Sequence, residues 1–121
     1  MLQDPIITIT DLKGKVKAFC GARDWDQYHN AKDLAIGVST EAGELLDLFR
    51  FKSPEEVEAM LRDARERAEI EDEMSDVFFF LLRLGQKYDI DLAQAFERKL
   101  AKNALKYPVE TSRGSNKKYG K

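Results

Sequence analysis

Apolar residues recur every three or four positions along most of the chain, which is the spacing of one face of an α-helix. The first such pattern predicts a helix with Thr10 or Asp11 as its N-cap. Its apolar face comprises Leu12, Val16, Phe19 and Cys20. A polar and aromatic connection follows over residues 21–29, and residues 6–10 have strand-like composition over too short a length to found a sheet.

Residues 30–51 continue the helical spacing and predict a second helix. The next helix is expected to begin at Pro54, because Ser53 is a favourable N-cap and proline suits the first helical position. Glu56 completes a capping box with Ser53. The helical pattern then continues for too many residues for one ordinary helix, so we expect a break near residues 62–63.

The last helix is predicted over residues 92–107, with Asp91 as its N-cap and Pro108 as its stop. Together these patterns predict an all-α protein, a four-to-five-helix bundle with a single domain over residues 1–109. Residues 110–121 contain Gly, Ser and Lys in the proportions of a chain end, and we expect them to form a basic, mobile tail.

The composition agrees with a helical protein and bears on its partners. Of the 121 residues, 43% are hydrophobic, which is enough for a core, and 35% are charged, which exceeds the usual value of about 25%. Amphipathic helices provide the long polar surface that so many charges need. The net charge of −2 argues against a nucleic-acid partner, although residues 108–121 carry +3 and the remainder −5.

The sequence also predicts where the protein works. No stretch approaches the roughly 20 apolar residues of a membrane helix, so no membrane partner is expected. The N-terminal residues lack the basic start of a signal peptide. The single cysteine, Cys20, excludes an internal disulfide and suits a reducing compartment. We therefore expect a cytoplasmic protein in which Cys20 is a small core residue.

Glu41 lies inside the apolar stripe of the second predicted helix. Because successive residues are about 100° apart around a helix axis, its neighbours one and two turns away can be identified, and all are apolar. They are Leu34, Val38, Leu45 and Leu48. Glu44 lies at the edge of the same stripe. Burying a lone carboxylate costs several kcal/mol, so Glu41 requires a cation, a basic partner or a raised pKa.

A second group of acids follows the break near residues 62–63. The acidic stripe consists of Glu69, Asp72, Glu73 and Asp76, and the adjacent apolar stripe of Ile70, Met74, Val77, Leu81 and Tyr88. The acidic stripe continues into Phe80 and Leu84, because residues 78–82 are apolar on every side. We therefore expect Glu73 and Asp76 to be partly buried, with something to offset their repulsion.

Two acid pairs result, each spanning one helical turn: Glu41 with Glu44, and Glu73 with Asp76. If the two helices pack face to face, four carboxylates meet. Such an all-oxygen site favours Mg²⁺, with Mn²⁺ as the alternative, and the absence of a Cys/His cluster disfavours zinc. A solvated helix face would explain any single acid, whereas the two pairs together favour a metal site.

Basic and aromatic residues supply further candidates. Lys99 and Asn103 lie on the apolar face of the last predicted helix, and Lys106 lies near its edge. Lys99 either extends to solvent along its own stem, pairs with an acid of the protein or, like Lys106, meets an anionic group held by the metals. Trp25 and His29 lie in a polar connection, where they would stack on or hydrogen-bond to a nucleobase. Alternatively, Trp25 closes the end of the bundle and His29 is structural.

The order of these residues resembles a family signature. EAGE at 41–44, followed after 28 residues by EMSD at 73–76, is similar to the EXXE…EXXD motif of the MazG-like, all-α nucleoside triphosphate pyrophosphatases. Residues 23–29 (RDWDQYH) resemble the aromatic segment of the dCTP pyrophosphatase branch of that family. Residues 99–108 resemble the closing motif of the family, so that the resemblance covers residues 12–107.

The resemblance implies that the four acids of the two pairs are Mg²⁺ ligands at the catalytic centre. Our suggestion for the general base is Glu44, and Lys99 would help to hold the charge that develops on the phosphates. The resemblance further implies that Trp25 and His29 contact the base or sugar, and that Lys99 and Asn103 contact the phosphate and sugar end of the substrate.

Two substrate-contacting positions differ from the branch that the sequence resembles. Phe51 stands where the branch has a tryptophan, and Phe80 stands where it has a tyrosine. Both differences remove a polar group and would alter which base is accepted.

The implied function is Mg²⁺-dependent hydrolysis of a (d)NTP to a (d)NMP and pyrophosphate, with dCTP or a modified pyrimidine nucleotide as substrate, in cleaning of the nucleotide pool. The resemblance implies a homodimer or homotetramer, and the apolar residues on every side at 78–82 favour association as well. The alternatives are a non-catalytic helical metal-binding interaction module and a related dimeric dUTPase.

Overall fold

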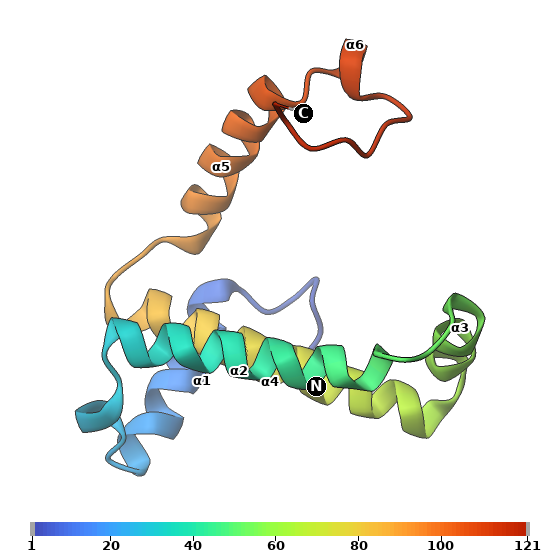
Figure 1. Ribbon diagram of the computed structural model, residues 1–121. Coiled ribbons are helices and arrows are strands. Elements are labelled where there is room, and N and C mark those ends of the chain that lie inside the picture. Colours follow the sequence, from blue (N-terminus) through green and yellow to red (C-terminus); the bar gives the residue numbers. More distant parts are fainter. Residues whose placement is uncertain (1, 121) are drawn as a thin grey trace. The chain divides into compact units, whose positions relative to one another are not determined.

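The computed structural model describes residues 2–120, and all of their regular structure is helical (Figure 1). The elements are α1 (Ile9–Ala22), the 3₁₀-helix η1 (Asp26–Tyr28), α2 (Ala31–Phe49), α3 (Pro54–Arg62), α4 (Ala64–Lys87), α5 (Leu92–Lys106) and α6 (Val109–Ser112). The predicted all-α class is confirmed. No helix in the described part of the chain is long and apolar enough to cross a membrane.

The chain forms two compact units that meet in sequence between Asp89 and Ile90. In the first unit, α4 runs back along α2, and these two helices share the most extensive packing (Figure 1). Helices α1 and α3 also pack against α4. The side chains that are buried in this unit are Val16, Cys20, Leu34, Met60, Ile70, Leu82 and Arg83. The predicted role of Cys20 as a core residue is therefore confirmed.

Side-chain caps fix where most of the helices begin. Ser53 and Glu56 form the predicted capping box at the start of α3, with Pro54 at the first helical position. Asp63 ends α3, and its carboxylate accepts a hydrogen bond from the backbone N–H of Glu66 to begin α4. This places the break where it was predicted. Asp91 caps α5 in the same way, as the sequence indicated.

The start of α1 differs from the prediction. Thr8, rather than Thr10 or Asp11, is the N-cap, because its hydroxyl accepts a hydrogen bond from the backbone N–H of Asp11. The Asp11 carboxylate in turn accepts from the backbone N–H of Thr8. Asp11 is therefore the third residue of a capping box, and the helix begins two residues earlier than the first predicted cap would place it.

Helices α2 and α4 meet along seams whose residues are spaced by three and four. The α2 seam contains Leu34, Val38, Glu41, Leu45 and Leu48, and the α4 seam contains Ile70, Glu73, Val77, Phe80 and Leu84; all are buried or half-buried. The predicted apolar stripe of α4 is wrong in part, because Met74, Leu81 and Tyr88 are exposed. Since residues 78–82 are apolar on every side, periodicity did not define the inner face there.

The second unit contains α5 and α6. Helix α6 was not predicted, because its four residues are too few to show a periodic pattern. Residues beyond α6 approach the end of α5, where the backbone N–H of Tyr119 donates a hydrogen bond to the hydroxyl of Tyr107. The rings of Tyr107 and Tyr119 meet edge to face with their centroids 6.4 Å apart. The described part of the tail thus folds back onto the helix that precedes it.

Candidate metal centre

Two of the predicted acids occupy seam positions between α2 and α4. Glu41 lies on α2 between Val38 and Leu45, and Glu73 lies on α4. Both side chains are half-buried, as their place in the seams requires. The second acid of each pair, one turn further along its helix, is exposed. The expectation that Asp76 is partly buried is therefore wrong, whereas it is correct for Glu73.

The four acids converge. One carboxylate oxygen from each of Glu41, Glu44, Glu73 and Asp76 lies within 4.8 Å of each of the other three. Helix α2 supplies one pair and α4 the other, so the cluster exists only because the two helices run back along one another. The structure thus brings together the two acid pairs that the sequence singled out.

The cluster is electrostatically unfavourable unless a cation or protons are present. One oxygen of Glu41 and one of Glu73 are inaccessible to solvent and accept no hydrogen bond, although buried carboxylates normally do. Burial, followed by the effects of Glu44 and of the other acids, raises the pKa of the Glu41 carboxyl above its usual 4.5. Burial and the same neighbours raise the pKa of Glu73.

These features fit a hard divalent cation. Each pair offers one buried oxygen that lacks a partner and one exposed carboxylate, so an ion between the pairs would be held by protein oxygens while remaining open to water or phosphate. All the donors are carboxylates, which suit Mg²⁺, Mn²⁺ or Ca²⁺ rather than soft metals. The acidic cluster can therefore bind a metal ion.

Trp25 and His29 lie in the segment that connects α1 to α2. The Trp25 ring packs edge to face between Phe19 of α1, at a centroid distance of 5.6 Å, and His29, at 6.1 Å. Trp25 remains 38% exposed, so it is neither a closed core residue nor fully solvated. Its backbone N–H donates to the carbonyl of Cys20, which ties the segment to the end of α1.

Sequence reasoning missed the residue that holds this segment in place. Arg83 of α4 is 1% exposed, and its guanidinium donates from Nε to His29 Nδ1 at 3.0 Å and from another nitrogen to the Asp26 carboxylate. Lys87, one turn later, donates to the backbone carbonyls of Asp26 and His29. The sequence did offer a signal for Arg83, because it is the one charged residue in the otherwise apolar run of residues 77–84.

The two predicted phenylalanines differ in position. Phe80 is half-buried in the α4 seam and packs against Gly37 of α2, one turn before Glu41. Phe51 lies beyond the end of α2, ten residues after Glu41, and is 92% exposed. Its backbone is left-handed at φ 66°, and the Arg50 guanidinium lies 4.5 Å from the centre of its ring. Phe80 thus borders the acidic pair of α2, whereas Phe51 is separated from it in sequence by the end of the helix.

The remaining predicted residues belong to the second unit. On α5, Lys99 is exposed and Asn103 is half-buried. Lys106 lies with its ammonium 5.6 Å from the centre of the Tyr119 ring. Within this unit the apolar face of α5 is open, as the exposed side chains of Phe96 and Leu100 show.

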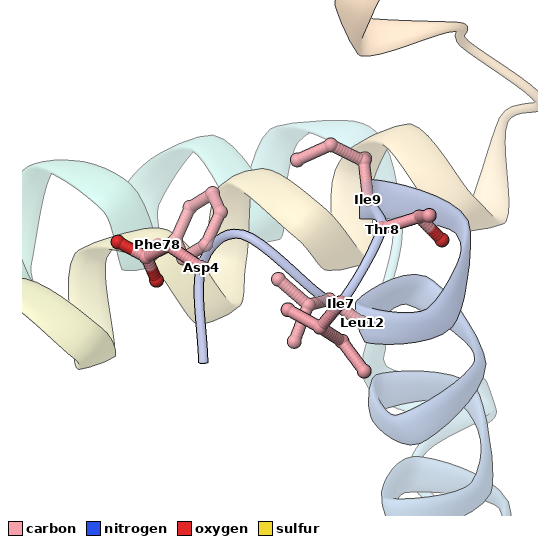
Figure 2. A pocket seen from close by; sticks show the side chains of 6 residues that line it. All are labelled: Asp4, Ile7, Thr8, Ile9, Leu12 and Phe78. Atoms are coloured by element: carbon pink, nitrogen blue, oxygen red, sulfur yellow. The ribbon is translucent and has the colours of Figure 1, made fainter. Parts of the chain in front are cut away.

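An apolar groove lies apart from the acids, between the segment that precedes α1 and the outer face of α4. It encloses about 470 Å³ and is lined by Asp4, Ile7, Thr8, Ile9, Leu12 and Phe78. Figure 2 shows Ile7 and Leu12 together at the start of α1, with Phe78 projecting from α4 beside Asp4. None of the four clustered acids lines this groove.

The fold and the cluster define a class: all-helical proteins in which two antiparallel helices present paired carboxylates that can bind a metal ion. The sequence model of the MazG-like family matches residues 36–121, and the chain belongs to that family. The family resemblance inferred from the two acid motifs is therefore confirmed.

Several known proteins are similar to this chain. dCTP pyrophosphatase 1 of Bos taurus is 38% identical over 112 residues, which cover 93% of this chain and 66% of the bovine protein. dCTP pyrophosphatase 1 of Homo sapiens is 34% identical over 115 residues, which cover 95% of this chain and 68% of the human protein. The chain thus spans about two thirds of the length of these relatives.

A solved structure supports the same fold. The crystal structure of a pyrophosphatase from Archaeoglobus fulgidus superimposes with a TM-score of 0.77 at 33% sequence identity, covering 89% of this chain and 99% of the archaeal one. The archaeal chain is therefore matched over nearly its whole length.

Proposed function

We propose that this chain is a metal-dependent nucleotide pyrophosphohydrolase that converts a (d)NTP and water to a (d)NMP and pyrophosphate. The observation that carries the proposal is the cluster of four acids in which two buried oxygens lack a partner. Bringing a polyanionic substrate to such a cluster requires a cation between them. The pyrophosphatase relatives, which match 89–95% of this chain, make a phosphoanhydride the substrate class to expect.

The ion we propose is Mg²⁺, with Mn²⁺ as a substitute. Glu41 and Glu73 would hold it through their buried oxygens, and Glu44 and Asp76 would complete the ligand set from the open side. When bound, the ion would offset part of the negative charge of the triphosphate and would make its phosphorus easier to attack. A carboxylate that is not fully engaged would take a proton from water, and exposed Glu44 is the candidate.

The reaction breaks the phosphoanhydride between the α- and β-phosphates. The water oxygen bonds to one of the two phosphorus atoms, the bridging oxygen leaves with the other, and the water proton passes to the carboxylate. Lys99 and Lys106 are positive charges suited to the phosphates, and Asn103 is suited to the sugar. All three residues belong to the second unit of the chain.

For the base we propose Trp25, His29, Phe80 and Phe51 as contacts. Trp25 offers a partly exposed ring for stacking, and Phe80 lies in the seam beside the acids. A pyrimidine deoxynucleotide, dCTP or a modified form, is the substrate suggested by the names of the curated relatives. Removal of such nucleotides in the cytoplasm would clean the nucleotide pool, and the single buried thiol of Cys20 suits that reducing compartment.

We also propose that the protein works as a homodimer or homotetramer. Met74, Phe78 and Leu81 form an exposed apolar stripe on α4, and a second copy of the chain would cover it. Phe78→Glu is expected to convert the assembly to monomers in analytical ultracentrifugation. A wild-type protein that sediments as a monomer at micromolar concentration would contradict this part of the proposal.

The test of the proposed activity is a turnover screen of common and modified (d)NTPs with and without Mg²⁺, in which monophosphate and pyrophosphate are measured separately. Equal amounts of the two products are expected, with activity lost in Glu41→Gln and Glu73→Gln. Glu71→Gln is the matched control, because Glu71 lies on α4 with an exposed side chain and is outside the cluster. Absence of both products in the presence of Mg²⁺ would favour a non-catalytic metal-binding module, and turnover confined to dUTP would favour a dUTPase.

A further inference from the structure

We propose that Arg83 is a positioning residue, which fixes the segment carrying Trp25 and His29 for contact with the nucleotide. This inference rests on the proposed function, because it concerns how the substrate's base is held. It begins with the burial of Arg83. The Arg83 side chain is 1% exposed, and removing its charge from water carries a desolvation penalty. An apolar side chain of similar volume would pack at this position at least as well without that penalty.

What the guanidinium does provide is a defined set of partners. It donates to His29 Nδ1, to the Asp26 carboxylate and to the amide oxygen of Gln86. Two of these partners lie more than fifty residues away in sequence, in the connection between α1 and α2. Because the planar guanidinium presents its donors in a fixed fork, it selects one register of this connection against α4.

Lys87 acts on the same segment from one turn further along α4. Its ammonium donates to the backbone carbonyls of Asp26 and His29, which lie at the two ends of the short turn formed by η1. Arg83 therefore holds the side chains of this turn and Lys87 holds its backbone. Trp25, which precedes η1 and packs against His29, takes its position from the same anchors.

The anchor and the metal cluster share one helix face. Asp76 and Arg83 are seven residues apart on α4, which corresponds to two turns and about 10 Å along the axis. The segment held by Arg83 therefore lies over the same face of α4 that carries Asp76. One rigid helix sets the spacing between the acids that would hold the phosphates and the aromatic segment that would hold the base.

The test uses a surface variant that does not disturb the core. Asp26→Asn removes the charge that pairs with Arg83, and the Asp26 side chain is 67% exposed, so the fold should be retained. Asp24→Asn is the matched control, because it makes the same chemical change in the same segment without contacting Arg83, and its left-handed backbone at φ 53° tolerates asparagine. Arg83→Met and Arg83→Lys complete the set, with Arg65→Met as the exposed control on α4.

Steady-state kinetics are measured on the 121-residue chain with Mg²⁺ and the nucleotide of highest kcat/KM in the turnover screen. Asp26→Asn is expected to raise KM about five- to tenfold while kcat changes less than about twofold, because a misplaced base contact is lost equally from the bound substrate and the transition state. Arg83→Met should raise KM further, and Arg83→Lys should lie between. Both controls should retain the wild-type KM.

Trp25 supplies a second readout, because it is the only tryptophan in the chain. Asp26→Asn and Arg83→Met should increase quenching of its fluorescence by acrylamide without nucleotide, while Asp24→Asn should not. If the wild-type protein is active and these two variants keep its KM, the positioning role is overturned and the proposed function stands. If the wild-type protein releases pyrophosphate from no nucleotide in the screen, the proposed function fails, and the positioning role fails with it. Should Arg83→Met not fold, Asp26→Asn decides the question.

Discussion

The ring of Phe80 lies against the backbone of Gly37, so closely that a Cβ atom on Gly37 would meet ring atoms at 2.6 Å. This contact joins α2 to α4 one turn before Glu41 and one turn after Asp76. The close approach of the two helices therefore depends on a glycine at this point. Because each helix supplies one acid pair, the spacing of the acids depends on it as well.

Gly37→Ala is expected to destabilise the protein by about 1–3 kcal/mol, because the added methyl group forces the Phe80 ring or the helices apart. Urea denaturation measures this change. Gly14→Ala is the control, since a Cβ atom there meets nothing within 4 Å and alanine favours a helix interior by up to about 1 kcal/mol. If both variants gain stability, the packing described for Gly37 is incorrect.

The raised pKa values of Glu41 and Glu73 predict how the metal-free protein responds to pH. Between the usual pKa of 4.5 and the raised values these two carboxyls bind more protons in the folded state than in the unfolded state, so the stability they contribute falls as the pH rises through that interval and is absent above it. Glu41→Gln should therefore raise the melting temperature of the metal-free protein at pH 7.5 by about 3–5 °C, and by less at pH 4.5. Differential scanning fluorimetry measures the shift.

Bound metal should reverse the order of the melting temperatures of the wild-type protein and Glu41→Gln. Saturating Mg²⁺ is expected to raise the melting temperature of the wild-type protein at pH 7.5, because binding to the folded state alone stabilises it, and to leave Glu41→Gln nearly unchanged. Glu71→Gln, outside the cluster, should respond as the wild-type protein does. An equal response of Glu41→Gln would show that the ion binds elsewhere.

His29 is expected to remain neutral over an unusually wide range of pH. Burial, then the charges of Arg83 and Lys87, lower its pKa below the usual 6.5. Since the unfolded state then binds the proton more readily, this residue contributes stability that is complete above pH 6.5 and declines as the pH falls below it. The chain has one histidine, so a single NMR resonance reports the titration.

The expected midpoint of that titration is below 6.5. Arg83→Met should move the midpoint upward, because it removes the positive charge that lowers the pKa of His29 most. Asp26→Asn should move it the opposite way, since the carboxylate favours the charged imidazole. A wild-type midpoint above 6.5 would contradict the hydrogen bond from Arg83 to His29 Nδ1.

Phe51 combines a left-handed backbone at φ 66° with a 92% exposed ring. Because a bulky residue is strained in this conformation and glycine is not, Phe51→Gly is expected to stabilise the chain by about 1 kcal/mol in urea denaturation. The same change should raise KM if the ring contacts the nucleotide as proposed. A loss of stability would indicate that a second copy of the chain covers the ring.

Much of the fold follows from local chemistry in the sequence. Ser53 and Asp91 begin their helices where the sequence placed them, because a capping side chain acts on backbone groups two or three residues away. The start of α1 was misplaced because Asp11 can serve either as an N-cap or as the third residue of a capping box, and only the geometry of Thr8 decides.

The candidate site was visible for a related reason. Glu41 interrupts an apolar stripe, and burying a lone carboxylate in such a stripe is energetically unfavourable unless a partner is present. The inner face of α4 was harder to define, because its apolar run has no polar side to orient it. Arg83 could not be assigned a role, since its partner His29 is 54 residues away and comes into contact only through the packing of the connection on α4.

The most direct test of the central claim is a titration of the protein with Mn²⁺ monitored by electron paramagnetic resonance. The signal of free Mn²⁺ decreases as the ion binds to the protein, so the decrease measures binding. We expect the wild-type protein and Glu71→Gln to bind the ion with the same affinity. Glu41→Gln and Glu73→Gln should each weaken binding about tenfold or more, a loss of roughly 1.4 kcal/mol or above. Equal affinity in all four proteins, or no binding by the wild-type protein, would contradict a metal centre shared between α2 and α4.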